Sequence, residues 1–143
     1  MSESPAAQRV REITSYHAHV YFGDPAERER AAWIRDRVAE RFRVQMGRWH
    51  DRPVGPHASP MYQIAFTIDL FAMLVPWLML NRRGLSVLVH PNTDNPHDDH
   101  LVHALWLGRP LAIDGSRLPK SLRDTGEPVE VITPNTDPMI DPI

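Results

Sequence analysis

The sequence predicts an α+β domain in which a four-stranded antiparallel sheet carries two helices on one face. Two observations support this prediction: four short runs with strand-like composition and two longer segments with helix signals. They follow one another in the order strand, helix, strand, strand, helix, strand. A chain of 143 residues is long enough for one such domain. We place the domain at residues 1–114 and expect residues 115–143, which hold five of the 14 prolines, to form a proline-rich tail that packs on it.

The strands are predicted from alternation of apolar and polar side chains. Residues 13–22 form the first strand, residues 44–49 a short second, residues 61–68 the third and residues 85–90 the fourth, which Pro91 closes. At most one further short strand is expected in the tail, at residues 129–132. The first strand has an apolar face with Tyr16, Ala18, Val20 and Phe22, and an opposite face with His17, His19 and Tyr21.

The helices are predicted from their caps and from apolar spacing. Asp24, Pro25 and Glu27 form a variant of the capping box, so a helix should begin there and run to about residue 43. Its buried stripe should be Ala31, Ile34, Val38 and Phe42. A second helix is expected from a cap at Asp69 through Leu80, with a kink or restart at Pro76.

This order of elements is that of a ferredoxin-like βαββαβ sandwich. In that topology the first strand lies between the third and the fourth, and the two helices cover one face of the sheet. The fourth strand runs antiparallel to the first, so His90 should lie within reach of His17. The face that the helices leave open should therefore gather His17, His19 and His90.

Composition excludes several classes of function. The formal charge of −2 and the absence of a dense basic run argue against nucleic acid as a partner. No run approaches the roughly 18 apolar residues of a membrane span, and residues 1–11 lack the apolar core of a secretory signal. We therefore expect a cytoplasmic protein with no membrane partner. With no cysteine and eight histidines, any metal ion must be held by histidine and carboxylate.

His17 and His19 are the best candidates for metal ligands. Two histidines at positions i and i+2 of a strand point the same way, and this short chelate suits a divalent ion when a third ligand arrives from elsewhere. His90 could be that ligand. The alternative interpretation is a pair of half-exposed polar side chains on a solvated sheet face.

A second group of candidates follows the fourth strand. If residues 98–103 are helical, His100 and His103 share one face, and the loop before them could fold them over the open face of the sheet. His57, in a rigid Gly-Pro-His loop, could approach the same pocket. The alternative is a capped surface helix whose Asp98 and Asp99 complement the helix dipole.

Five segments together resemble the DOPA 4,5-dioxygenase family. They are Tyr16-His17-Ala18-His19-Val20-Tyr21-Phe22, the Gly55-Pro56-His57 loop, Trp77-Leu78 with Leu80-Asn81-Arg82, residues 84–93, and Asp99-His100 with residues 103–108. The resemblance covers residues 16–114. It implies a ferredoxin-like fold and extradiol cleavage of a catechol such as L-DOPA, with non-haem Fe(II) and O₂; Zn²⁺ or another divalent ion is an alternative occupant in an isolated sample.

On this resemblance, we expect His17, His19 and His90 to bind the metal. His57, His100 and His103 are expected to act as acid–base or substrate-binding groups. A facial triad would also need a carboxylate. Asp99 could supply it, or the ligands could all be histidines.

Two other functions are compatible with the same residues. One is a non-catalytic histidine site that holds Zn²⁺ or Cu²⁺ for storage or sensing. The other is a pocket that binds an aromatic ligand without reaction, with the open sheet face buried in a dimer. We expect a homodimer whose small-molecule partners are an aromatic diol and O₂.

Overall fold

The computed structural model describes residues 4–143. It contains one antiparallel sheet of five strands in the order β2-β3-β1-β4-β5. The strands are β1 (Ser15–Tyr21), β2 (Gln45–Met46), β3 (Met61–Phe66), β4 (Val87–Asn92) and β5 (Leu105–Leu107). The helices are α1 (Pro25–Arg41), α2 (Phe71–Asn81), α3 (Pro96–Leu101) and α4 (Leu122–Thr125), with 3₁₀ turns at Val10–Glu12 and Ile68–Leu70.

Helix α1 begins and packs as its sequence predicts. Asp24 accepts a hydrogen bond from the Glu27 backbone N–H, and the Glu27 side chain accepts one from the Asp24 N–H, which completes the capping box. The predicted stripe of Ala31, Ile34, Val38 and Phe42 is buried. The hydroxyl of Tyr62 on β3 donates to the Ala31 carbonyl at 2.7 Å and ties the helix to the sheet.

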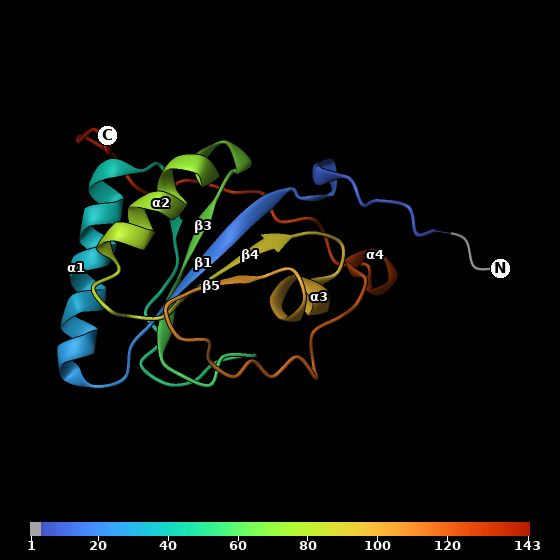
Figure 1. The fold of residues 1–143 in the computed structure, drawn as a ribbon, viewed down its shortest axis with the longest axis horizontal. Coiled ribbons are helices and arrows are strands. Elements are labelled where there is room, and N and C mark those ends of the chain that lie inside the picture. The colour runs from blue at the N-terminus through green and yellow to red at the C-terminus, as the bar shows by residue number, and fades with distance from the viewer. Residues whose placement is uncertain (1–3) are drawn as a thin grey trace.

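The two faces of the sheet are covered differently. Figure 1 shows α1 and α2 side by side on one face, where the main hydrophobic core includes Ala18, Val20 and Phe22 of the first strand region. The other face carries a smaller apolar cluster of Tyr21, Met61 and Leu88. Side chains from beyond β4 pack against this cluster, namely those of Ala104, Trp106, Leu111 and Ile113. The chain's own residues thus cover much of the face that was expected to be open.

The prediction of a four-stranded sheet is wrong, because β5 adds a fifth strand at the edge beside β4. Three residues are too few to show an alternating pattern, so β5 has no signal of its own. The expected position of β1 between β3 and β4 is confirmed. The second strand is shorter than expected, and pairing with β3 resumes only at a single bridge from His50 to Met61.

Strand β4 is shifted toward the C-terminus and continues through Pro91 instead of ending before it. The neighbouring Asn92 accepts a hydrogen bond from Thr14 on the β1 side. Because alternate residues of a strand bond to opposite neighbours, the nitrogen of Pro91 faces the other side, beyond the point where β5 pairs with Val89. The missing N–H of proline therefore breaks no ladder hydrogen bond.

Two details of α2 differ from the sequence prediction. Asp69 is not its N-cap: a 3₁₀ turn at Ile68–Leu70 leads directly into the helix, and the capping position is Leu70. The helix also continues through Pro76 without a restart. Pro76 and Ala72 are both exposed, so water can reach the carbonyl that the proline leaves without a donor.

The tail contains the short helix α4 and no strand at residues 129–132. Its end lies along the β2 edge of the sheet, where Asn135 accepts from the Met46 N–H at 2.7 Å and donates to the Met46 carbonyl at 2.9 Å. Thr136 accepts from the Val44 N–H at 2.9 Å. Within residues 4–143, no helix combines the length and the apolar character needed to cross a bilayer.

Candidate metal centre

Five histidines from four parts of the chain lie together on the face of the sheet opposite α1 and α2. Antiparallel pairing of β1 and β4 places His17 directly opposite His90, with ring centres 5.0 Å apart. The ring of His57 lies 4.2 Å from that of His19, and the ring of His100 on α3 lies 3.9 Å from that of His90. We call these five residues the histidine cluster.

Two groups of three within the histidine cluster have ring nitrogens close enough to share an ion. In each group the nitrogens lie within 4.8 Å of one another; the first group is His17, His19 and His90, and the second is His19, His57 and His100. The first group is the predicted ligand set. The prediction that His90 lies within reach of His17 is confirmed by the strand register.

Hydrogen bonds orient the rings and set their tautomers. Nδ1 of His90 lies 2.9 Å from the Pro91 carbonyl oxygen, and Nδ1 of His100 lies 2.8 Å from that of Pro96. A carbonyl oxygen only accepts, so both rings carry their hydrogen on Nδ1. In the neutral state Nε2 of each ring therefore keeps a lone pair. A carbonyl that fixes one imidazole nitrogen and frees the other is typical of metal-binding histidines.

His19 lies at the centre of the cluster and has incomplete hydrogen bonding. Its Nε2 is 3.0 Å from Nε2 of His90. Among residues 4–143, its Nδ1 is a buried nitrogen without a hydrogen-bond partner. Two nitrogens bound at about 2.1 Å and at a right angle on one ion lie about 3.0 Å apart. The spacing of the two Nε2 atoms thus fits a divalent ion.

Burial keeps four rings of the histidine cluster uncharged, those of His19, His57, His90 and His100. His19 and His90 are 2% and 1% exposed, and desolvation, reinforced by the neighbouring imidazoles, holds their pKa values well below the ordinary range. Burial also lowers the pKa of His57 to about 4, and it lowers the pKa of His100. At neutral pH these rings are therefore in the form that binds metal ions.

His57 is paired with a tyrosine. The Tyr21 hydroxyl lies 2.7 Å from Nδ1 of His57, and both side chains are buried. Burial raises the pKa of Tyr21, so its hydroxyl keeps its proton. A hydroxyl can both donate and accept, so the pair allows His57 to carry its hydrogen on either ring nitrogen.

A cleft of about 850 Å³ reaches the cluster from outside. His17 and His100 line it from the cluster side, and the loop after β4 and the tail form its other walls. The wall residues include Asn92, Asp94, Arg123 and Glu130. A small organic molecule in this cleft would lie beside two of the five imidazoles.

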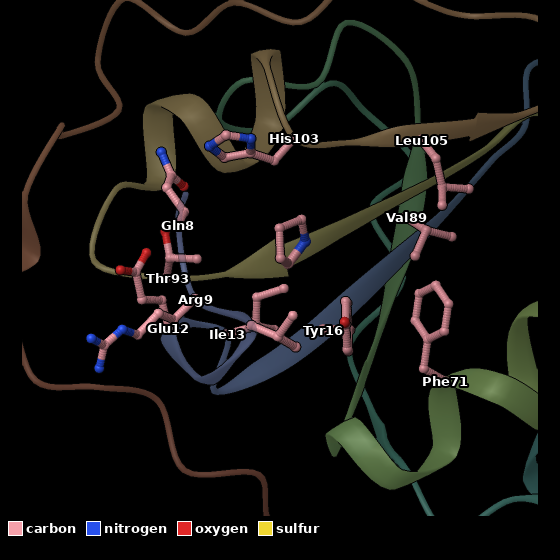
Figure 2. A pocket seen from close by; sticks show the side chains of 12 residues that line it. Gln8, Arg9, Glu12, Ile13, Tyr16, Phe71, Val89, Thr93, His103 and Leu105 are labelled. Carbon is pink, nitrogen blue, oxygen red and sulfur yellow. The ribbon is translucent and has the colours of Figure 1, made fainter. Parts of the chain in front are cut away.

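His103 is not brought into the cluster. The expected helix ends at Leu101, so His103 lies beyond its last turn and is exposed. It lines both the cleft and a second hollow of about 330 Å³ on the helix side of β1 and β4. Figure 2 shows this hollow, with Tyr16, Phe71 and Leu105 at its apolar wall and His103 at its rim.

The predicted carboxylate, Asp99, is engaged elsewhere. It is 2% exposed, and its two oxygens accept from the backbone N–H and the hydroxyl of Thr93, each at 2.7 Å. These bonds hold the loop between β4 and α3. Asp98 lies 2.9 Å from Nδ1 of His97. The structure therefore places neither carboxylate in the two groups of clustered nitrogens.

Sequence reasoning missed two residues that contact the cluster. Tyr21 was placed on the correct face, but its bond to His57 depends on a loop whose path has no sequence signal. Glu130 comes from the tail, and its Oε2 lies 2.9 Å from Nε2 of His17. Nothing in the composition of the tail distinguishes this glutamate from others.

The fold and the site define a small α+β protein with a histidine-rich centre suited to a metal ion. The Dopa 4,5-dioxygenase family matches residues 16–117, most of the chain. The chain therefore belongs to the Dopa 4,5-dioxygenase family, as the motifs of its sequence indicate.

Two individual relatives support the assignment of this chain to the family. A DOPA 4,5-dioxygenase of Amanita muscaria is 34% identical over 121 residues, which are 76% of this chain and 51% of the relative. An uncharacterized 21.2 kDa protein of Botryotinia fuckeliana is 32% identical over 112 residues, 70% of this chain and 61% of the relative. The chain thus spans between half and two thirds of these curated relatives.

A solved structure has a higher sequence identity to this chain than these two relatives, over nearly all of its own length. The crystal structure of a Nostoc punctiforme protein, provisionally described as a dioxygenase, is 51% identical, with a TM-score of 0.75. The match covers 77% of this chain and 95% of that protein. The Nostoc protein and this chain are therefore similar in both fold and sequence.

Proposed function

We propose that this protein is an extradiol ring-cleaving dioxygenase that acts on a catechol such as L-DOPA with non-haem Fe(II) and O₂. The observation that carries the proposal is the group of His17, His19 and His90, whose ring nitrogens lie within 4.8 Å of one another beside an open cleft. Membership of the family supports the class of reaction.

His17, His19 and His90 would hold the ion. His90 is preset for this role because the Pro91 carbonyl fixes its hydrogen on Nδ1 and leaves Nε2 free. When bound, Fe(II) with few protein ligands would supply open positions at which a catechol and O₂ can meet. Burial of His19 and His90 keeps bulk water away from that side of the site.

His57 and His100 are suited to moving protons next to the ligands. His57 is uncharged at neutral pH, so one of its nitrogens can accept the proton that a catechol hydroxyl must lose. Tyr21 bonds to the other nitrogen and holds the ring in place. Nε2 of His100 has a lone pair, and His100 belongs to the same group of histidines as His19 and His57.

His103 has a different position from the other two proposed acid–base or substrate-binding residues. It is exposed at the rim of the cleft, so its role would be contact with the part of the substrate that lies farthest from the ion. A His103→Ala variant should keep its metal content and show a raised KM.

The test is anaerobic loading with Fe(II), addition of L-DOPA or a simple catechol, and admission of air. We expect a yellow ring-opened semialdehyde and matching O₂ uptake, both lost without Fe(II) and in a His17→Ala variant. His50→Gln, outside both groups of clustered histidines, is the matched control and should remain active. Stoichiometric metal binding with no O₂ uptake across several catechols would contradict the proposal and favour a non-catalytic metal-binding protein.

A further inference from the structure

The tail crosses the mouth of the histidine cleft between two anchored points. At the first anchor, Asp94 holds the α4 region: it accepts from the Ser121 hydroxyl at 2.8 Å and from the Arg123 N–H at 2.9 Å. At the second, Thr133 donates its N–H to the Gln45 side chain at 2.7 Å, next to the bonds of Asn135 along β2. Figure 1 shows the tail running from α4 back past β1 toward α1.

Residues 127–133, which we call the strap, have little structure of their own between these anchors. Val129 and Val131 are 60% and 80% exposed, so the strap is not held by burial of its apolar side chains. Within the described part of the chain, residues 4–143, the segment 128–132 makes one hydrogen bond, between Glu130 and His17. The middle of the strap is therefore attached to the protein at the predicted metal ligand.

The contact between Glu130 and His17 is a charge-assisted hydrogen bond. Oε2 of Glu130 lies 2.9 Å from Nε2 of His17, whose side chain is 12% exposed. A glutamate carboxyl ordinarily has a pKa of about 4.3, so the side chain is a carboxylate at neutral pH. A carboxylate without a proton can only accept, and so the hydrogen of the bond belongs to Nε2 of His17.

The bond to Glu130 fixes the tautomer of His17, as carbonyl oxygens fix the tautomers of His90 and His100. In His90 and His100 one nitrogen donates to a carbonyl oxygen and the other keeps its lone pair. In His17 Nε2 donates to Glu130, and the nitrogen left for an ion is Nδ1. An acceptor on the far nitrogen fixes the tautomer and orientation of a ligand and raises its basicity.

We propose that Glu130 is a positioning residue of the metal centre, carried by the strap and acting through His17. The inference rests on the metal site of the proposed function. It goes beyond the family, because residues 127–133 lie outside the matched segment, 16–117. It also gives the site a carboxylate in contact with a ligand ring, whereas Asp99 is bonded to Thr93.

Metal affinity of the full chain tests the proposal without reference to turnover. We would titrate metal-free protein with Co²⁺ against a chromophoric chelator, for the wild type and for Glu130→Gln, Glu130→Asp and Glu127→Gln. Loss of an outer-shell partner typically weakens binding by roughly 10–100-fold, and we expect that loss in Glu130→Gln. Glu130→Asp should recover part of it. Glu127→Gln, in the same strap and lining the same cleft, should bind as the wild type does.

Two spectroscopic readouts separate positioning from a general loss of structure. The visible absorption of bound Co²⁺ should change in Glu130→Gln, because the orientation of one ligand ring changes. Nitrogen-15 NMR of the metal-free wild type should show His17 with its hydrogen on Nε2, and Glu130→Gln, whose amide can donate as well as accept, should weaken that preference. Urea unfolding should give equal midpoints for the two proteins, because the Glu130 side chain is 37% exposed.

The outcomes distinguish this inference from the proposed function. If the wild type binds Co²⁺ and Glu130→Gln has the same affinity and the same spectrum, the positioning role of Glu130 is wrong. The proposed metal site is then unaffected. A wild-type His17 with its hydrogen on Nδ1 would also overturn the role. If the wild type binds no Co²⁺, both the proposed metal site and the proposed role of Glu130 are wrong.

Discussion

Burial keeps the imidazole of His19 uncharged, and the uncharged imidazole is the form that binds a metal ion. Its position at the centre of both groups of nitrogens makes it the ligand whose loss should matter most. We predict that His19→Ala abolishes stoichiometric metal binding, measured as metal per protein after loading and dialysis. His50→Gln is the control, and His19→Ala protein that keeps one equivalent of metal would contradict the assignment.

Asp99 stabilises the loop between β4 and α3. Its buried carboxylate accepts two hydrogen bonds from Thr93, and an asparagine would keep one good acceptor and place an amide N–H₂ against a donor. We predict that Asp99→Asn lowers the free energy of unfolding by about 1–3 kcal/mol while the metal content stays the same. Denaturant unfolding and metal analysis check the two parts. Loss of metal from a folded variant would instead make Asp99 a ligand.

At the scale of elements, α1 depends on its capping box. Asp24 and Glu27 satisfy N–H groups that the first turn of a helix otherwise leaves without partners. We predict that Asp24→Ala lowers the free energy of unfolding by about 1 kcal/mol. Thermal unfolding measures the effect, and Glu29→Ala, exposed on the same helix, is the control. Equal midpoints for the two variants would show that the cap contributes nothing.

The elements also show where sequence prediction stops. For β1 and α1 the local signals are complete, because alternation and capping each act within a few residues. For α3 the sequence leaves the length open: a helix through residue 103 would have placed His103 beside His100. The helix instead ends at Leu101, whose side chain packs near Gly115 of the tail region, and His103 turns to the rim of the cleft.

At the scale of the whole molecule, the cluster links stability to pH. The pKa values of His19, His57, His90 and His100 are lowered in the folded protein, whereas the unfolded chain binds protons near pH 6.5. Below pH 6.5 the unfolded state therefore binds more protons than the folded state, so the free energy of unfolding falls as pH falls. For His57 this loss continues to about pH 4.

We therefore predict that metal-free protein is most stable above pH 6.5 and loses stability steadily between pH 6.5 and 4. Urea unfolding at several pH values measures the slope. His57→Gln should have a shallower slope than the wild type, because one titrating ring is removed. A free energy of unfolding that does not change across this range would show that the rings are protonated in the folded state.

The expected homodimer stays a prediction at this scale. The sheet face opposite α1 and α2 is packed by Trp106, Ile113 and neighbouring residues of the same chain, so a dimer would need another surface. Size-exclusion chromatography at two concentrations measures the oligomeric state. A single monomeric peak at both would contradict the expectation.

The sequence by itself determined the α+β class, the pairing partners of β1 and the face on which His17, His19 and His90 lie. These features follow from side-chain period and capping, which act over short distances and are visible in order along the chain. Only the tertiary structure decided the fifth strand, the pairing of Tyr21 with His57 and the contact of Glu130 with His17. These contacts join residues as much as 113 positions apart, and packing of loops and tail brings them together without leaving a local pattern in the sequence.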